Sequence, residues 1–327
     1  MATANQIKAL LKSHVTGDDE KFITIAMQVA AHEAKQGHTK LAQELKVLIT
    51  EAKNKKTHNS NVLSLVRTNK ELDGILNHSE PYIDFSELTF SDNQSKTFKR
   101  IIQEYKQQEK LKSYNLHPRR KILLYGPPGT GKTATASALA NELKLPFFTI
   151  RLDGLITKFM GETASKLRMV FDAIRSTRGL YFFDEFDAIG SDRMSPNDVG
   201  EIRRVLNSFL QFLEQDHSDS FIVAATNYKN LLDPALFRRF DDVLHYDLPE
   251  SSQIKHLISC KLSEFPLKIK TDEWKKVEKV AEGLSHAEIS RACEDAAKQM
   301  ILEEGTSLSF QNITDMLEDR KKAKSNV

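Results

Sequence analysis

The sequence has few cysteines, and this scarcity excludes two classes of protein. Cys260 and Cys293 are the only cysteines among 327 residues, which is too few for a fold held together by disulfides. Neither belongs to a CxxC pair or lies near a histidine cluster, so the sequence offers no zinc site. We expect two reduced thiols in a cytoplasmic protein.

Long apolar runs are also missing. No stretch approaches the ~18 continuous apolar residues of a spanning helix, and the first 20 residues lack the apolar core of a signal peptide. This start is also too acidic and too poor in arginine for an organelle transit peptide. The sequence therefore predicts cytoplasmic localisation and no membrane partner.

A strong net charge is absent as well. The chain has 47 Lys and Arg against 45 Asp and Glu, a net charge of +2, which does not favour a chain dominated by nucleic-acid binding. The stretch 96–121 is locally basic. It could meet nucleic-acid phosphates, but we favour a solvated helix face, the more common reason for a run of charges.

Hydrophobic periodicity divides the chain into four segments. Residues 1–56 carry three short apolar stripes at helical spacing and predict a three-helix bundle. Residues 57–94 are polar at first and hard to interpret, and we assign them to a linker. Residues 95–248 alternate apolar strands with helices, whereas 249–327 are helical and end in a basic tail.

The alternating segment predicts the fold class. Its short apolar runs are KILLYG from Lys121, PFFTIRL from Pro146, LYFFDEF from Leu180 and SFIVAATN from Ser220, with helices between them. This pattern is typical of an α/β domain with a parallel sheet covered on both faces. The all-helical segment then forms a second domain from about Pro249.

The run GPPGTGKT provides the strongest chemical signal. It fits G-x-x-x-x-G-K-[ST], follows a predicted strand and begins a predicted helix. Such a loop turns its backbone N–H groups toward phosphates, the lysine reaches the β- and γ-phosphates, and the final hydroxyl binds Mg²⁺. The predicted ATP-binding residues are Gly126, Pro127, Pro128, Gly129, Thr130, Gly131, Lys132 and Thr133.

A pair of carboxylates follows the apolar run 180–183. Asp184 is placed to bind Mg²⁺, directly or through water. Glu185 is the candidate to activate the attacking water. Carboxylates beside a buried strand need a charge partner, which a metal ion supplies, so the two motifs together predict ATP hydrolysis.

With these motifs and the run LLDPALFRRFDDVLHYDLP, the chain resembles the AAA+ ATPases, on the katanin and spastin side of that superfamily. The resemblance extends from about Phe85 to Glu304. It implies an α/β nucleotide-binding domain followed by a helical lid, assembled into a homohexamer that hydrolyses ATP at subunit interfaces.

The resemblance implies roles for three further catalytic residues. Asn227 matches the sensor residue that positions the attacking water, and Arg238 and Arg239 match paired arginine fingers. A guanidinium from a neighbouring subunit would stabilise the charge that develops on the γ-phosphate. Considered without the family, the two arginines could equally form ion pairs with Asp241 or Asp242.

The resemblance also implies a substrate-gripping pore loop at Phe159, Met160 and Gly161. Phe159 would press against a threaded polypeptide, Met160 would add an adaptable apolar contact and Gly161 would allow a tight turn. The alternative is a helix N-terminal turn with Phe159 in the core.

This chain departs from the family pattern at the start of a lid helix. Relatives often have G-A-D there, and this chain has His286, Ala287 and Glu288. The contacts that the lid makes to adenosine cannot be carried over at these positions.

Three functions remain open from the sequence. We favour a hexameric remodelling ATPase that threads protein substrates, with residues 1–56 recruiting a substrate or partner and with a separate protease as an open downstream partner. The alternatives are a nucleic-acid-acting ATPase that uses the 96–121 stretch, and a non-processive ATP switch that controls assembly with a partner protein.

Overall fold

The computed structural model describes residues 8, 13, 19–35, 38, 42–43, 45–46, 72, 74–81, 83–155, 160–186, 199–227 and 237–325. The chain forms two units, residues 1–68 and 69–327. In the described part of the chain, no helix is long and apolar enough to cross a membrane.

The first unit contains helix α2 (Asp19–Lys35). Val29 and Ala30 on this helix are buried, in keeping with an apolar stripe at helical spacing. Most of the first and third helices of the predicted bundle lies outside the described residues.

The second unit is built on a six-stranded sheet in the order β1-β3-β4-β5-β2-β6. The first strand pairs antiparallel with β3, and every other pair is parallel. The strands are β1 (Leu76–Ser79), β2 (Lys121–Tyr125), β3 (Phe147–Ile150), β4 (Leu180–Phe183), β5 (Phe221–Thr226) and β6 (Asp242–His245). This confirms the predicted mixed α/β class with a mostly parallel sheet.

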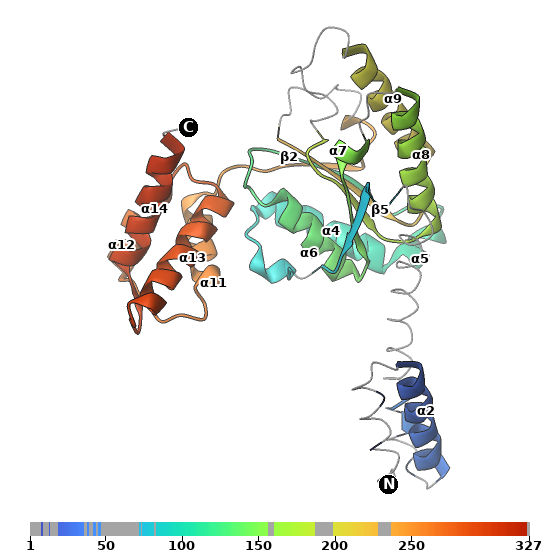
Figure 1. Ribbon diagram of the computed structural model, residues 1–327, viewed down its shortest axis with the longest axis horizontal. Helices are drawn as coiled ribbons and strands as arrows, with labels where there is room; N and C mark the ends of the chain where they lie inside the picture. The colour runs from blue at the N-terminus through green and yellow to red at the C-terminus, as the bar shows by residue number, and fades with distance from the viewer. Residues whose placement is uncertain are drawn as a thin grey trace. The chain divides into compact units, whose positions relative to one another are not determined.

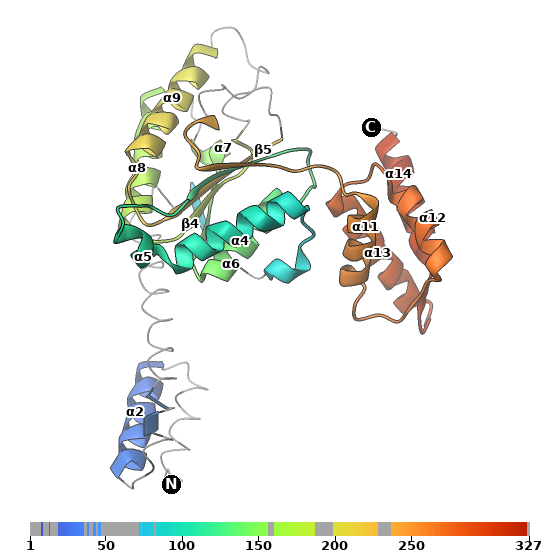
Figure 2. The same cartoon turned by 180° about the vertical axis from the view of Figure 1, so that it is seen from behind.

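Helices cover both faces of the sheet (Figures 1 and 2). Fully buried strands such as β4 and β5 require this double covering, because every side chain faces a packed layer. One layer consists of α4 (Asp92–Lys106), α5 (Gln108–Lys112) and α6 (Lys132–Leu143). The other contains α8 (Met160–Ser176) and α9 (Val199–Gln215), with the short α7 (Leu152–Leu155) preceding α8.

The C-terminal part is helical, as expected, and encloses a core of its own. A short parallel strand pair, which periodicity did not indicate, joins the helices. Its elements are α11 (Ser251–Lys261), β7 (Leu267–Lys268), α12 (Thr271–Ala281), α13 (His286–Leu302), β8 (Leu308–Ser309) and α14 (Phe310–Ser325). Ser285 caps α13, because its hydroxyl accepts a hydrogen bond from the Glu288 N–H while the Glu288 carboxylate accepts one from the Ser285 N–H.

The segment assigned to a linker differs most from expectation. β1 lies within 57–94 and forms the edge of the sheet, so the α/β unit begins well before residue 95. The 3₁₀ helix η1 (Phe85–Glu87) follows, and the Phe85 and Phe90 rings pack on each other with centroids 4.9 Å apart. A four-residue strand containing Asn77, His78 and Ser79 has too little apolar alternation to be recognised from sequence.

Candidate functional site

The strand order brings the ends of three strands, and the residues that follow them, to one edge of the sheet. β2 lies beside β5, and β5 lies beside β4. Because all three strands are parallel, their carboxyl ends meet at that edge. The predicted phosphate loop follows β2, Asp184 follows β4 and Asn227 follows β5.

The loop between β2 and α6 has the backbone shape that its glycines allow. Gly129 has a φ of 74° and Gly131 a φ of 96°, in the left-handed region that disfavours other residues. Gly131 is the N-cap of α6, so the loop leads directly into a helix N-terminus. Backbone N–H groups and the helix dipole there favour a bound anion.

Lys132 is the first residue of α6 and its side chain is buried in this loop. The ammonium Nζ donates hydrogen bonds to the carbonyl oxygens of Gly126 at 2.7 Å and Pro127 at 2.8 Å. Its positive charge is therefore held where the loop would surround a phosphate group.

Thr133 and Asp184 come together from α6 and the end of β4. The Thr133 hydroxyl donates a hydrogen bond to Oδ2 of Asp184 at 3.0 Å. One hydroxyl and one carboxylate beside a phosphate loop are oxygen ligands that Mg²⁺ accepts. The donor set therefore fits the predicted metal ion.

Glu185 continues the turn after Asp184. Its φ of 49° is unusual for a residue other than glycine, and its N–H donates a hydrogen bond to Oδ1 of Asp184 at 2.9 Å. The next residue, Phe186, is fully buried, and its ring lies 4.6 Å from that of Phe209 on α9. This aromatic anchor holds the turn, so the exposed Glu185 carboxylate points away from the core.

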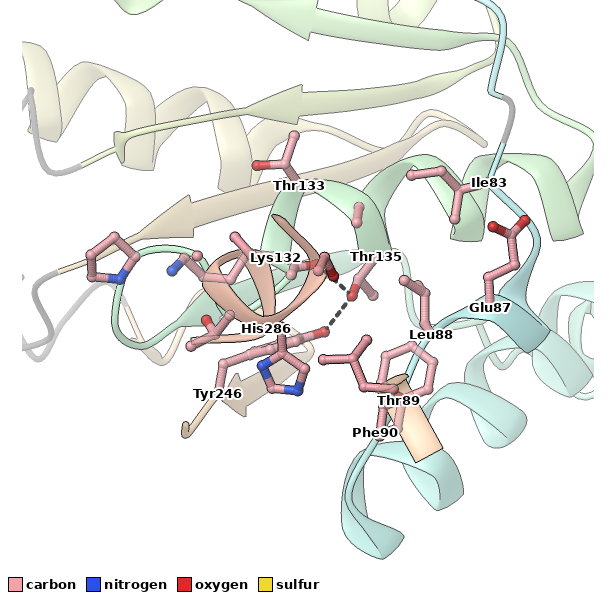
Figure 3. A pocket seen from close by; sticks show the side chains of 18 of the residues that line it. Ile83, Glu87, Leu88, Thr89, Phe90, Lys132, Thr133, Thr135, Tyr246 and His286 are labelled. Carbon is pink, nitrogen blue, oxygen red and sulfur yellow. Dashed lines mark hydrogen bonds between the residues drawn. The ribbon is translucent and has the colours of Figure 1, made fainter. Parts of the chain in front are cut away.

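One cavity of about 540 Å³ lies beside the phosphate loop, a size typical of small-molecule sites. Figure 3 shows side chains around it, including Lys132, Thr133, Tyr246 and His286. The loop residues Pro128 to Thr133 line it together with Asp184, Glu185 and Asn227. The structure thus brings together two of the predicted catalytic residues and all of the predicted nucleotide residues except Gly126 and Pro127, which do not line the cavity.

The C-terminal helical part closes one side of this cavity. The N–H of Ala287, at the start of α13, donates a hydrogen bond to the Gly129 carbonyl at 2.9 Å. A Cβ added to Gly129 would lie 2.7 Å from the Ser285 hydroxyl oxygen, closer than real contacts allow. The phosphate loop and α13 are therefore fitted to each other at Gly129.

We expect Gly129→Ala to weaken ATP binding by about tenfold or more. An alanine would be strained at this φ by roughly 1–2 kcal/mol, and its Cβ would push Ser285 away. The free loop relieves this strain by leaving the phosphate-binding conformation, and restoring that conformation when ATP binds costs about tenfold in affinity. Titration with a fluorescent ATP analogue measures the change. Gly74→Ala is the control, because a Cβ there meets nothing within 4 Å. Unchanged affinity in Gly129→Ala would contradict the close fit.

Sequence reasoning missed the segment before α4 as part of the site. Ile83 and the run Glu87–Phe90 line the cavity, and the run is anchored because the Phe90 ring packs on Phe98 with centroids 5.1 Å apart. The aromatic residues Phe85 and Phe90 in this segment were the available signal, but aromatic residues alone do not indicate which surface they join.

Sequence reasoning also assigned no role to His286. It lines the cavity from the first position of α13. Burial lowers the pKa of its imidazole to about 4, so the ring is neutral at neutral pH. Tyr246 also lines the cavity, and its hydroxyl donates a hydrogen bond to Oγ1 of Thr135 at 2.9 Å.

The two predicted arginine fingers do not line the cavity of their own chain. Arg238 is exposed. Arg239 forms an ion pair with Glu214 of α9, with Nε and Oε1 2.7 Å apart. The acids considered as alternative partners have other contacts, because Asp241 accepts two backbone N–H bonds and Asp242 pairs with Arg100.

The predicted pore loop is described only in part. Phe159 lies outside the described residues. Met160 begins α8 and Gly161 follows in its first turn.

Comparisons with known proteins agree with these motifs. Residues 122–248 match the model of the "ATPase family associated with various cellular activities (AAA)". The chain is 32% identical to an AAA family ATPase of Sinorhizobium fredii, named y4kL, over 99% of this chain and 97% of that protein.

Other relatives are longer than the part they share. A proteasome-activating nucleotidase of Methanopyrus kandleri is 32% identical over 68% of this chain and 53% of its own length. One from Sulfurisphaera tokodaii is 33% identical over 76% of this chain and 64% of its own length. This chain therefore spans only about half to two thirds of these nucleotidases.

Proposed function

This chain belongs to the AAA family of ATPases, and from that premise we propose that it uses ATP hydrolysis to remodel protein substrates. One observation carries the nucleotide chemistry: Lys132, Thr133, Asp184, Glu185 and Asn227 line a single cavity. The similarity to proteasome-activating nucleotidases supports a protein as the substrate.

In this proposal the phosphate end of the cavity binds ATP and Mg²⁺. Backbone N–H groups of the loop and the Lys132 ammonium hold the phosphates, and Thr133 and Asp184 provide oxygen ligands for the metal ion. Mg²⁺ neutralises charge on the phosphate oxygens when bound. Glu185 orients and deprotonates the attacking water, and Asn227 helps to position it.

We propose that the two arginines act on the neighbouring subunit. Arg238 and Arg239 lie outside the cavity of their own chain, and Arg238 is exposed. In a homohexamer, an exposed arginine of one subunit can reach the γ-phosphate held by the next. This arrangement makes hydrolysis dependent on assembly.

Substrate handling is assigned to the remaining segments. The segment from Phe159 to Gly161, which leads into the first turn of α8, grips the substrate in the ring pore. Residues 1–56 recruit a substrate or partner, and a separate protease receives the unfolded chain. The katanin and spastin branch belongs to this proposal on the resemblance of the motifs alone.

The structure does not favour the nucleic-acid alternative. Most cations of the 96–121 stretch already contact acids or carbonyl oxygens of the same chain, which reduces the positive charge available to phosphates. The contacts are Arg100 with Asp242, Lys106 with Glu142, Lys112 with Asp219, Arg119 with Glu104, Arg120 with Asp216, and Lys121 with the Asp216 carbonyl.

We expect Phe159→Ala to abolish substrate unfolding and to preserve ATP turnover. The substitution removes most of the apolar area that grips a chain of changing sequence, while the cavity residues remain. The probe is a fluorescent protein with an unstructured tail, and its fluorescence is followed beside phosphate release. Tyr114→Ala is the matched control, because Tyr114 is a 72% exposed aromatic residue distant in sequence from the loop.

Three results would count against this proposal. Normal unfolding by Phe159→Ala would remove the pore role. Loss of nucleotide binding in that variant would place Phe159 in the core. A wild-type protein that never unfolds the probe, and whose turnover rises with DNA at low salt, would favour the nucleic-acid alternative.

A further inference from the structure

The turn that carries the two predicted arginine fingers, residues 237–241, is attached to β2 at both ends. At its start the Phe237 ring packs edge-on against the ring of Tyr125, the last residue of β2, with centroids 6.3 Å apart. At its end Asp241 contacts Lys121, the first residue of β2. The two arginines therefore lie on a backbone segment that is held along the length of one strand.

Asp241 makes three hydrogen bonds to the backbone at the start of β2. One carboxylate oxygen, Oδ2, accepts from the N–H groups of Arg120 and Lys121, each at 2.9 Å. The N–H of Asp241 donates to the carbonyl oxygen of Lys121 at 2.8 Å. Hydrogen bonds to an ionised acceptor are roughly twice as strong as neutral ones. Because β6 is the last strand in the sheet order and pairs with β2, this clasp fixes the turn where the sheet holds it from one side.

Arg120 and Lys121 also hold the end of α9, through their side chains. The Arg120 guanidinium pairs with the buried Asp216 carboxylate and donates to the Asp216 carbonyl oxygen. The Lys121 ammonium donates to the same carbonyl oxygen at 3.1 Å. Glu214, in the last turn of α9, forms the ion pair with Arg239. The turn is thus tied to this point of the sheet twice, directly by its own aspartate and indirectly through α9.

We infer that Asp241 is a positioning residue for the two arginines, because it clasps their turn to the start of the strand that leads into the phosphate loop. The inference rests on the proposed action of these arginines on the neighbouring subunit. β2 ends at Tyr125 and Gly126 begins the loop, so one strand connects the site that a chain holds with the arginines that it offers. A misplacement of about 1 Å can cost roughly 10²-fold in rate, and a long side chain is aimed correctly only if its backbone is fixed.

We expect Asp241→Ala to lower ATP hydrolysis about 10–100-fold and to leave ATP affinity within about threefold, because the phosphate loop keeps its own residues. Asp241→Asn should retain most of the activity, because both N–H groups donate to a single oxygen and an amide has one. Asp241→Glu keeps the charge, but its added methylene displaces the oxygen, so it should be slower than Asp241→Asn. Asp272→Ala, at an exposed aspartate of α12, is the matched control.

Mixed rings separate positioning of the arginines from support of the chain's own site. Asp241→Ala subunits keep an intact phosphate loop, so adding Lys132→Ala subunits, which have correctly placed arginines, should restore part of the activity. Adding Arg238→Ala subunits should restore none, because both variants then lack a correctly placed arginine. A variant that has merely lost its structure would recover with neither. If Asp241→Ala proves insoluble, Asp241→Glu takes its place in the mixtures.

The outcomes distinguish this inference from the proposed function. Wild-type turnover in Asp241→Ala would overturn the inference, and so would a lack of recovery with Lys132→Ala where Arg238→Ala does recover with it. The proposed function would stand in both cases. An active Asp241→Glu beside an inactive Asp241→Asn would also overturn it, since charge and not placement would then matter. If Arg238→Ala and Lys132→Ala fail to recover together in rings that contain both, the action on the neighbour is wrong and the inference falls with it.

Discussion

Replacing Glu185 with glutamine is expected to stop ATP hydrolysis while ATP still binds. The amide keeps the size of the side chain and lacks the basic carboxylate, so the attacking water is no longer deprotonated. General base catalysis contributes typically 10²–10⁴-fold, and we expect a loss of that order in phosphate release. Nucleotide affinity should stay within about threefold, because Lys132, Thr133 and Asp184 remain in place.

The comparison requires two measurements on one preparation, equilibrium binding of ATP and steady-state phosphate release. Glu264→Gln makes the same substitution at an exposed residue that does not line the cavity and should behave as the wild type. Equal turnover in Glu185→Gln and the wild type would remove the catalytic role. Proteins retained with ATP by the inactive variant would identify its substrates.

Loss of the arginines is expected to have a comparable or larger effect on rate. Arginine fingers contribute 10³–10⁵ to the rate of other phosphoryl-transfer enzymes, and we expect Arg238→Ala to lower hydrolysis within that range with ATP affinity largely retained. Arg239→Ala should also be slow. Part of its effect would come from the lost ion pair with Glu214, which Glu214→Gln measures separately.

Mixed rings distinguish action on the neighbour from action within one chain. Lys132→Ala subunits should bind ATP poorly while carrying intact arginines, whereas Arg238→Ala subunits should bind ATP but lack the arginine. Mixing these two inactive proteins should restore part of the activity, because some intact sites then receive an intact arginine. No recovery, in rings shown by mass spectrometry to contain both, would argue that Arg238 acts within its own chain or only supports structure.

The sequence by itself determined the parts of the site that are local. The phosphate loop could be predicted because its glycines, Lys132 and Thr133 are consecutive between an apolar strand and a helix. Asp184 and Glu185 could be predicted because they directly follow a fully buried strand. The alternation of apolar strands with helices indicated the α/β class, and helical periodicity indicated the helical part that follows.

Only the tertiary structure decided which distant segments meet. β1 was too short and too polar to be recognised and forms an edge strand because it pairs with β3. The contact between Thr133 and Asp184 depends on the order of the strands, which strand residues alone do not specify. Thr89 carries no signal in the sequence and His286 shows only a departure from the family pattern, and it is the fold that buries polar atoms of both in one cavity. Burial and pairing are properties of the packed chain, and for these residues no local pattern encodes them.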